Sequence, residues 1–499
     1  MKPILLLLLS GIAAFAQAPQ ACAPSDFKGT WNGWGINTSN TRHQTATTIT
    51  ADNVTKLDVK WAFGFPNSRT VFGQPAIVNG RVFVGSDTGE VYALNASTGC
   101  VHWMYKAENG VRTAVTVGSV GNNRTAAFFG DGKGKVYAVD ANTGAELWKA
   151  VAEAHPTAKL TGAPVLFEDK LYVPVASGEE GAGGGANYAC CTFRGSVVAF
   201  AAASGRQVWK TYVIQTEPKE TGKKANGVAK LGPSGAGIWS PPTIDAKRRQ
   251  LYVGTGDAYS SPADKATDAI VAMNLDDGKI KWIAQDSEGD IWLSACMSPN
   301  KPDDCGPDHD FGSPAMLVSA AGRDLLVVGQ KSGNVWAHDP DTGKVVWRSP
   351  LVANTTEFGG KIVWGGSSDS DKAYFGLGPG GIAAVQLRDG EKQWFTDIPV
   401  APGMEKHTGH EGPLTTAPGL VFSGSWDGML RALSAKDGKV LWSFNTAREF
   451  PTVNGVAAKG GSMGAPGPVV AGDMLFVSSG YVGVRQGVGG NVLLAFQVK

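Results

Sequence analysis

The sequence predicts an all-β protein, an eight-bladed β-propeller, from three observations: a repeated motif, its interruption at both chain ends, and a glycine-rich composition. The 499 residues include 67 glycines, and only 18% of them are charged. Many glycines and few charges are typical of a packed all-β fold with many turns. Such a length would ordinarily suggest several domains, but all-β arrays often run long as one unit.

The repeated motif reads apolar-x-Ala-apolar, followed by a glycine-containing turn and a tryptophan. Its first two copies span residues 91–103 and 136–148. Each copy fits two short strands of alternating polarity joined by a turn. Stacking such sheets around an axis buries faces that one sheet would leave exposed, and small alanines let neighbouring sheets approach closely. The motif alanines are Ala93, Ala138, Ala199, Ala272, Ala337, Ala384, Ala432 and Ala495.

The eighth copy is split between the two ends of the chain. The motif that contains Ala495 lacks its tryptophan, whereas Trp61 lacks a preceding strand. A closed ring accounts for both gaps if the strand near Trp61 pairs with the C-terminal blade. We therefore expect one propeller domain over residues 19–499. The motif tryptophans are spaced most widely between Trp148 and Trp347, which predicts extra loops there, and loops on a rigid ring often carry function.

Residues 1–18 are predicted to be a secretory signal peptide. Lys2 precedes an apolar stretch that ends near Phe15, and small-x-small cleavage motifs follow. The stretch is too short to span a membrane, and no other segment is long enough. The mature protein is therefore expected to be periplasmic or secreted, with no membrane span.

Cysteines and charge limit the remaining possibilities. Six cysteines in an exported chain indicate disulfides. Cys296 and Cys305 could close a short loop, Cys190 and Cys191 are adjacent, and Cys22 and Cys100, which are left by elimination, could tie the N-terminal arm to the first repeat. The formal net charge of +1 and the lack of a basic run give no support for nucleic-acid binding.

The eightfold repeat resembles that of the quinoprotein alcohol dehydrogenase superfamily, which implies the cofactor PQQ and Ca²⁺. The motif Cys190-Cys191-Thr-Phe-Arg-Gly resembles the polyvinyl-alcohol dehydrogenase branch, because it follows Glu180. In methanol-type members the cysteine pair lies earlier, before the equivalent of Thr161. The same repeat also occurs in non-catalytic propellers of the outer-membrane assembly type. The irregular segments must therefore distinguish an enzyme from a scaffold.

The resemblance assigns part of the cofactor site to residues 161–180. It implies that Thr161, Ser177 and Gly178 bind PQQ and that Glu180 binds the metal, with Glu179 as the alternative ligand.

The two faces of the planar cofactor are assigned to different groups. The resemblance implies that a disulfide between Cys190 and Cys191 lies flat against one face and that Trp239 lies against the other. Trp239 is outside the repeat register, and an extra tryptophan near the mouth of the ring suits a stacking platform. Trp364 is a further candidate for the wall.

Polar contacts to the cofactor are assigned to three more positions. Arg112 stands at the place of a cofactor-contacting arginine, with Arg194 as a second candidate. Gln74 replaces the glutamate usual at its place and could still hydrogen-bond the cofactor. Lys331 stands where family members carry a lysine or arginine bonded to the quinone oxygens, and it would stabilise negative charge on the reduced ring.

The metal and the general base are assigned to carboxylates. Asp257 stands at the place of an asparagine calcium ligand, and Ca²⁺ binds hard oxygen atoms of this kind. Asp310 resembles the catalytic base, with Asp308 as the competitor. Lanthanide-type relatives carry another aspartate where this chain has Gly312, which favours calcium. The implied metal ligands are Glu180, Asp257 and Asp310.

The resulting expectation is a periplasmic, PQQ- and Ca²⁺-dependent dehydrogenase of secondary or polymeric alcohols. Asp310 would take the alcohol proton while hydride passes to PQQ. The sequence contains no Cys-x-x-Cys-His motif for an attached haem, so electrons would leave to a separate soluble cytochrome c. Two alternatives remain: a non-catalytic scaffold of the outer-membrane assembly type, and an enzyme of the same fold that has lost PQQ.

Overall fold

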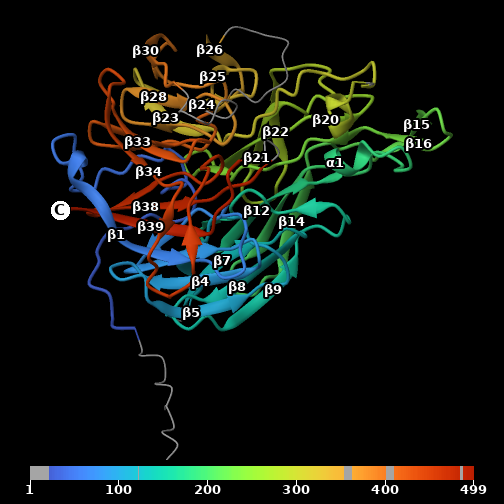
Figure 1. The fold of residues 1–499 in the computed structure, drawn as a ribbon. Helices are drawn as coiled ribbons and strands as arrows, with labels where there is room; N and C mark the ends of the chain where they lie inside the picture. Colours follow the sequence, from blue (N-terminus) through green and yellow to red (C-terminus); the bar gives the residue numbers. More distant parts are fainter. Residues whose placement is uncertain (1–21, 122, 300, 353–361, 400–408, 484–486) are drawn as a thin grey trace, which may run out of the picture.

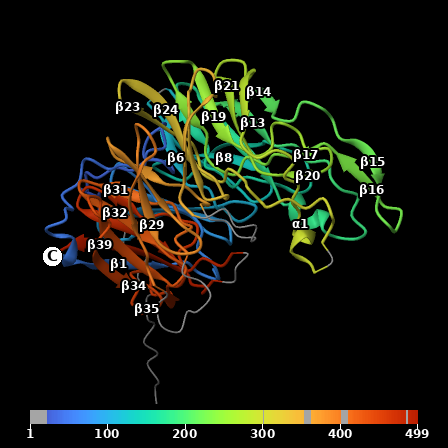
Figure 2. The same ribbon diagram turned by 90° about the horizontal axis from the view of Figure 1, so that it is seen from above.

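The computed structural model describes residues 22–121, 123–299, 301–352, 362–399, 409–483 and 487–499; the predicted signal peptide lies outside them. The described chain forms antiparallel sheets arranged around an axis (Figures 1 and 2). The prediction of an all-β, eight-bladed β-propeller is confirmed. Within the described part, no helix is long and apolar enough to cross a membrane.

The first four blades are given from the inner to the outer strand. They are β2 (Ala76–Val78), β3 (Arg81–Gly85), β4 (Glu90–Asn95) and β5 (Val101–Lys106); β6 (Thr116–Ser119), β7 (Thr125–Gly130), β8 (Lys135–Asp140) and β9 (Glu146–Val151); β11 (Val165–Phe167), β12 (Lys170–Ser177), β13 (Ser196–Ala201) and β14 (Gln207–Tyr212), extended by β10 (Ala158–Lys159); and β18 (Thr243–Asp245), β19 (Gln250–Gly254), β21 (Ala269–Asn274) and β22 (Ile280–Gln285).

The other four blades follow the same order. They are β23 (Met316–Ala320), β24 (Arg323–Gly329), β25 (Asn334–His338) and β26 (Val345–Pro350); β27 (Ser367–Ser368), β28 (Lys372–Gly376), β29 (Ile382–Gln386) and β30 (Lys392–Thr396); β31 (Thr415–Ala417), β32 (Leu420–Gly424), β33 (Met429–Ser434) and β34 (Val440–Asn445); and β37 (Val469–Ala471), β38 (Met474–Ser479), β39 (Val492–Val498) and β1 (Leu57–Gly64).

Short elements lie outside the blades. The hairpin β15 (Lys219–Lys223) and β16 (Ala229–Gly232) and the helix α1 (Glu179–Gly183) project together on one side of the ring (Figures 1 and 2). The remaining elements are β17 (Ser234–Gly235), β20 (Ala258–Ser260), β35 (Glu449–Phe450), β36 (Ala458–Lys459), and the 3₁₀ turns η1 (Val54–Lys56) and η2 (Ser294–Met297).

Alanine and tryptophan of the motif face each other across the two outer strands of each blade. Ala93 lies opposite Trp103, and the same register recurs around the ring. In the last blade the pair is Ala495 and Trp61, which joins the C-terminal strand β39 to β1. The split repeat is therefore completed by the first strand of the ring.

Seven of the eight joints between neighbouring blades use the tryptophan and the glycine of the motif. The indole N–H of Trp103 donates to the carbonyl of Ala141 at 3.0 Å, and its ring covers Gly144, where a Cβ would lie 2.9 Å away. Gly144 has φ of 76°, a conformation that favours glycine. The same contact between tryptophan and glycine recurs at Trp61, Trp148, Trp209, Trp282, Trp347 and Trp394.

The N-terminal segment 31–48 fills the central channel, because it bonds to the inner strands around the axis. Trp31 pairs with Ile77 of β2, and the carbonyls of Thr38, Ser39 and Thr41 accept hydrogen bonds from β18, β23 and β27. Within this segment, Arg42 is fully buried, stacked between Trp31 and Trp34, and donates to the carbonyls of Leu414, Trp34 and Pro468.

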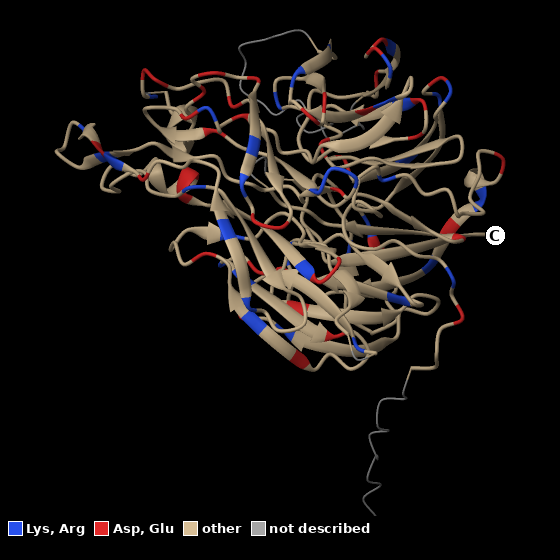
Figure 3. Ribbon diagram, turned by 180° about the vertical axis from the view of Figure 1, so that it is seen from behind, with Lys and Arg blue, Asp and Glu red and all other residues tan. Residues whose placement is uncertain are grey.

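Three disulfides join the six cysteines, as Cys22–Cys100, Cys190–Cys191 and Cys296–Cys305. The Cys22–Cys100 pair, which elimination left, and the Cys190–Cys191 pair, which the resemblance implied, are thereby confirmed. Acidic and basic residues are interspersed over the described chain, consistent with its near-neutral charge (Figure 3).

Candidate active site

Two kinds of segment build one cavity near the axis of the ring. Antiparallel pairing puts the start of each inner strand beside the end of the second strand. The segments before inner strands supply Arg112, Thr161, Trp239, Asp310 and Trp364, and those after second strands supply Asp257 and Lys331. The cavity has a volume of about 320 Å³, at the lower end of the range for small-molecule sites.

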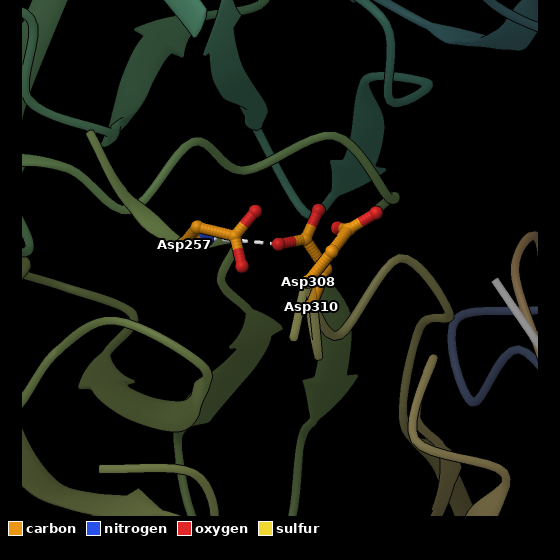
Figure 4. Close-up of side chains that lie close together, drawn as sticks. All are labelled: Asp257, Asp308 and Asp310. Carbon is orange, nitrogen blue, oxygen red and sulfur yellow. Dashed lines mark hydrogen bonds between the residues drawn. The ribbon is translucent and has the colours of Figure 1, made fainter. Parts of the chain in front are cut away.

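Three aspartates and a lysine form the polar centre of this cavity. Asp257, Asp308 and Asp310 are buried, and each offers a carboxylate oxygen within 4.8 Å of the others (Figure 4). The Lys331 ammonium lies 2.5 Å from Asp308 Oδ1 and 3.0 Å from Asp310 Oδ2. The backbone N–H of Asp257 donates to Asp310 Oδ1 at 2.8 Å, the bond drawn in Figure 4. Lys331 thus bridges the predicted base and its competitor.

The electrostatics of the centre distinguish these carboxyl groups. Burial raises the pKa of Asp308 to about 7, with a further contribution from the charge of Asp310. Burial also opposes ionisation of Asp310, but Lys331 and the hydrogen bond from Asp257 outweigh it and hold the pKa of Asp310 below its usual value. Asp310 is therefore the carboxylate that stays ionised near neutral pH.

Glu180 lines the cavity, and burial raises its pKa to about 7. Its neighbour Glu179, the alternative ligand, is fully buried elsewhere and accepts hydrogen bonds from Tyr188 and from the backbone N–H groups of Thr192 and Phe193. Glu179 therefore fixes the chain after the cysteines, which leaves Glu180 as the carboxylate that faces the cavity.

Aromatic rings and an arginine form another part of the wall. Trp239 and Trp364 meet edge to face at 4.8 Å between ring centroids, and the Lys331 ammonium lies 5.3 Å from the Trp239 ring. The Arg112 guanidinium lies over Trp364 at 4.2 Å and donates to the hydroxyl of Tyr481. Arg194, the second candidate, stacks on Tyr212 away from this lining. The geometry therefore favours Arg112.

Of the two adjacent cysteines, Cys190 faces a different hollow and Cys191 is fully buried. Cys190 lines an outer groove of about 840 Å³, together with Lys224, Lys230, Leu293 and the Cys296–Cys305 disulfide. Neither Cys190 nor Cys191 is among the residues that line the cavity. Tyr259 packs in the same apolar cluster as both cysteines and lines both hollows.

Two other predicted cofactor contacts also lie outside the cavity lining, whereas Thr161 and Ser177 are part of it. Gln74 is buried between Arg42, which donates to its side-chain oxygen at 2.7 Å, and the Trp34 carbonyl, to which its amide donates at 2.8 Å. Gly178 is the N-cap of α1, where a Cβ would contact the Lys159 side chain. The side chain of Gln74 thus forms its hydrogen bonds with the N-terminal segment in the channel.

Sequence reasoning missed several residues of the lining. Trp292 and Trp426 stand outside the repeat register, as Trp239 does, so this signal could have found them. The others carry no such signal. The missed residues with polar or aromatic side chains are Lys159, Tyr259, Trp292, Glu411, Trp426 and Tyr481.

Comparison with known proteins identifies the family. Residues 31–294 match the family described as glucose/ethanol/alcohol dehydrogenase, beta-propeller domain, which is the PQQ family. The polyvinylalcohol dehydrogenase of Pseudomonas sp is 40% identical over 94% of this chain and 77% of that protein. The one of Sphingopyxis sp. (strain 113P3) is 35% identical over 94% and 76%. The chain belongs to the PQQ-dependent alcohol dehydrogenase family, which confirms the predicted class of oxidoreductase.

Solved structures share the fold. Quinohemoprotein alcohol dehydrogenase ADHIIG from Pseudomonas putida HK5 superposes with a TM-score of 0.73 at 18% identity, over 94% of this chain and 80% of that one. BamB from Moraxella catarrhalis reaches 0.53 at 16% identity, over 88% and 99%. Residues 378–499 also match the family of outer membrane protein assembly factor BamB. The BamB matches show that this propeller architecture also occurs in another family.

The residues present fit the cofactor that the family implies. The cavity offers the indole ring of Trp239 as a planar surface and the cations of Arg112, Lys159 and Lys331 for an anionic ligand. The buried Oδ1 atom of Asp257 has no hydrogen-bond partner in the described chain, so it is available to a cation.

Proposed function

We propose that this chain is a PQQ- and Ca²⁺-dependent dehydrogenase of secondary or polymeric alcohols that works in the periplasm. One observation carries the proposal: Asp310, a buried carboxylate kept ionised by Lys331, shares a cavity with the Trp239 platform. The two polyvinylalcohol dehydrogenases support the substrate class, because they align with nearly the whole chain.

The residues that would hold PQQ and Ca²⁺ line the cavity. Trp239 would support the planar ring, and Arg112 and Lys159 would pair with the carboxylates of PQQ, with Thr161 and Ser177 as hydrogen-bonding neighbours. The proposed calcium ligands are Glu180, Asp257 and Asp310, which are hard oxygen donors. When bound, PQQ supplies a two-electron acceptor and Ca²⁺ supplies a Lewis acid, neither of which the side chains provide.

The side chains of the cavity have separate roles in the reaction. Asp310 accepts the proton of the alcohol hydroxyl as a general base. Asp257 fixes one oxygen of Asp310 through its backbone N–H, and Lys331 contacts the other oxygen. Lys331 also supplies positive charge beside the reacting centre, where negative charge develops. Electrons then pass to a separate soluble cytochrome c.

Reconstitution tests this function. The mature chain is purified from a host that makes no PQQ, and dye reduction is followed with primary, secondary and polymeric alcohols after addition of PQQ, CaCl₂, both or neither. We expect activity only when both are present, with secondary and polymeric alcohols as the better substrates. If PQQ fails to bind even in excess calcium, the enzyme proposal is wrong, and a partner-binding propeller such as the BamB match indicates takes its place.

A further inference from the structure

A second group of buried carboxylates lies behind the cavity. Asp257 shares this group with Asp268 and Asp290, and each residue offers an oxygen within 4.8 Å of the others. All three are at most 2% exposed. Asp268 and Asp290 do not line the cavity, so the group is distinct from the candidate active site and shares only Asp257 with it.

Asp268 has no donor to stabilise it. Neither of its carboxylate oxygens receives a hydrogen bond within the described chain, and the group that it faces is another carboxyl, that of Asp257. The Lys331 ammonium, one of the cations of the neighbouring cavity, is already bonded to Asp308 and Asp310. Burying an ionised carboxylate without a partner is unfavourable, so this group needs either a proton or a cation.

Asp290 is oriented by the loop that carries the proposed base. Its oxygens accept hydrogen bonds from the backbone N–H groups of Asp308 at 3.3 Å and His309 at 2.8 Å. A carboxylate oxygen has two lone pairs, so Asp290 can keep these bonds and still ligate a cation. Asp290 thus presents its carboxylate as a preformed ligand.

We infer that Asp257, Asp268 and Asp290 form a second divalent-cation site, made by the protein alone, with Ca²⁺ as its occupant. Three carboxylates offer up to six oxygens, which matches the six to eight that Ca²⁺ accepts in flexible geometry. Mg²⁺ retains several waters and suits a fully buried group of carboxylates less well. Asp257 would bridge this ion and the one proposed for the cavity.

The second ion would act as a positioning device. It would tie the loop after β19, which carries Asp257, to the segment before β23, which carries Asp290 and Asp310. The N–H of Asp257 binds Asp310, so the ion would hold the base in register without contacting substrate. This inference does not depend on PQQ, because all its ligands come from the chain.

Metal counting in the PQQ-free protein tests the site. The mature chain is stripped with a chelator, equilibrated with CaCl₂ and analysed by elemental mass spectrometry, and its Tm is measured as calcium rises. Four proteins are compared: wild type, Glu180→Gln in the cavity, Asp268→Asn in the second group, and Asp264→Asn as the matched control. Asp264 lies on the same loop but outside the group, and its oxygen accepts a backbone N–H bond that asparagine can keep.

We expect Asp268→Asn to bind one calcium fewer per chain than wild type, while Glu180→Gln and Asp264→Asn retain that ion. Calcium should raise the Tm of Asp268→Asn by less than it raises the Tm of the other three proteins. In calcium-free buffer Asp268→Asn should be at least as stable as wild type, because the substitution removes a facing carboxyl group. If Asp268→Asn does not fold, the inference is tested by Glu180→Gln alone, which should still bind calcium at the second site.

Two results would overturn the inference. One is a PQQ-free wild type and Glu180→Gln that bind no calcium even at millimolar concentration, which would mean that Asp257 and Asp268 share a proton instead. The other is an Asp268→Asn protein that binds as much calcium as wild type. Neither result bears on PQQ-dependent activity, so this inference and the proposed function can fail separately.

Discussion

The central cavity and the outer groove share the wall formed by Tyr259, but they are built from different parts of the chain. The cavity, at about 320 Å³, takes most of its lining from segments that begin or end blade strands, with Glu180 of α1 and Trp292 added from the insertions, and it gathers buried carboxylates around Lys331. The groove, at about 840 Å³, takes its lining from the region of α1, the β15–β16 hairpin and residues 291–305, and it presents lysines, apolar side chains and disulfide sulfur atoms.

The larger hollow is therefore poorer in groups that could carry a proton transfer. Reactive side chains converge where short segments from several blades meet at one end of the inner strands, because the ring holds those segments rigidly. The inserted loops around α1 and the β15–β16 hairpin instead project on one side of the ring (Figure 2). Three variants test whether the reaction depends on the cavity and not on the groove.

The largest effect is expected from Asp310→Asn. If Asp310 is the general base, its loss should lower kcat by about 10²–10⁴-fold, the usual contribution of general base catalysis. The measurement is steady-state dye reduction by protein saturated with PQQ and CaCl₂, with bound PQQ counted by absorbance. Asp264→Asn serves as the control and should retain wild-type kcat. An active Asp310→Asn protein would transfer the role of base to Asp308.

Lys331→Gln should have the next largest effect, because it removes one cation from the charge-developing centre. Loss of one such preorganised donor typically lowers kcat by about 10²–10³-fold. Lys331 also holds the pKa of Asp310 below its usual value. Without the lysine that pKa rises, so the acidic limb of the pH–rate profile should move to higher pH. A lower kcat with an unmoved acidic limb would show that Lys331 does not control the base.

The double variant Cys190→Ala/Cys191→Ala should have the smallest effect on the reaction. Cys190 lines the groove and neither cysteine lines the cavity, so kcat for a small secondary alcohol should change by less than about tenfold, or roughly 1.4 kcal/mol in the barrier. Trp239→Ala, which removes part of the cavity wall, is the matched comparison and should cost more. Loss of PQQ from the cysteine variant would mean that the disulfide belongs to the cofactor site.

The sequence predicted the ring well because each motif residue has one local role. Alanine faces tryptophan in the register of one blade, and the motif glycine lies under the tryptophan of the preceding blade. Short segments next to strands, such as those of Trp239, Asp310 and Lys331, could likewise be predicted, because their strands determine where they end.

Long insertions could not be predicted in this way. The cysteine pair lies between β12 and β13 of one blade, yet its position depends on the distant β15–β16 hairpin, whose Ala229 and Leu231 carbonyls accept its backbone N–H groups. Gln74 shows the same limit. It lies just before the inner strand β2, at a place where the resemblance implied a cofactor contact, but Arg42 of the channel segment determines what its side chain contacts.

Ribosomal synthesis begins at the N-terminus, and domains ordinarily fold in the order in which they emerge. In this fold the N-terminal residues need contacts with residues of the C-terminal blade. Thr48 bonds to Gly472, and Trp61 needs Ala495 as its partner, so the channel segment and the first strand have no complete binding surface until the eighth blade has been made. The cavity lining, which runs from Arg112 to Tyr481, is therefore complete only once the eighth blade has formed, and a cofactor that needs the whole lining must bind after that point.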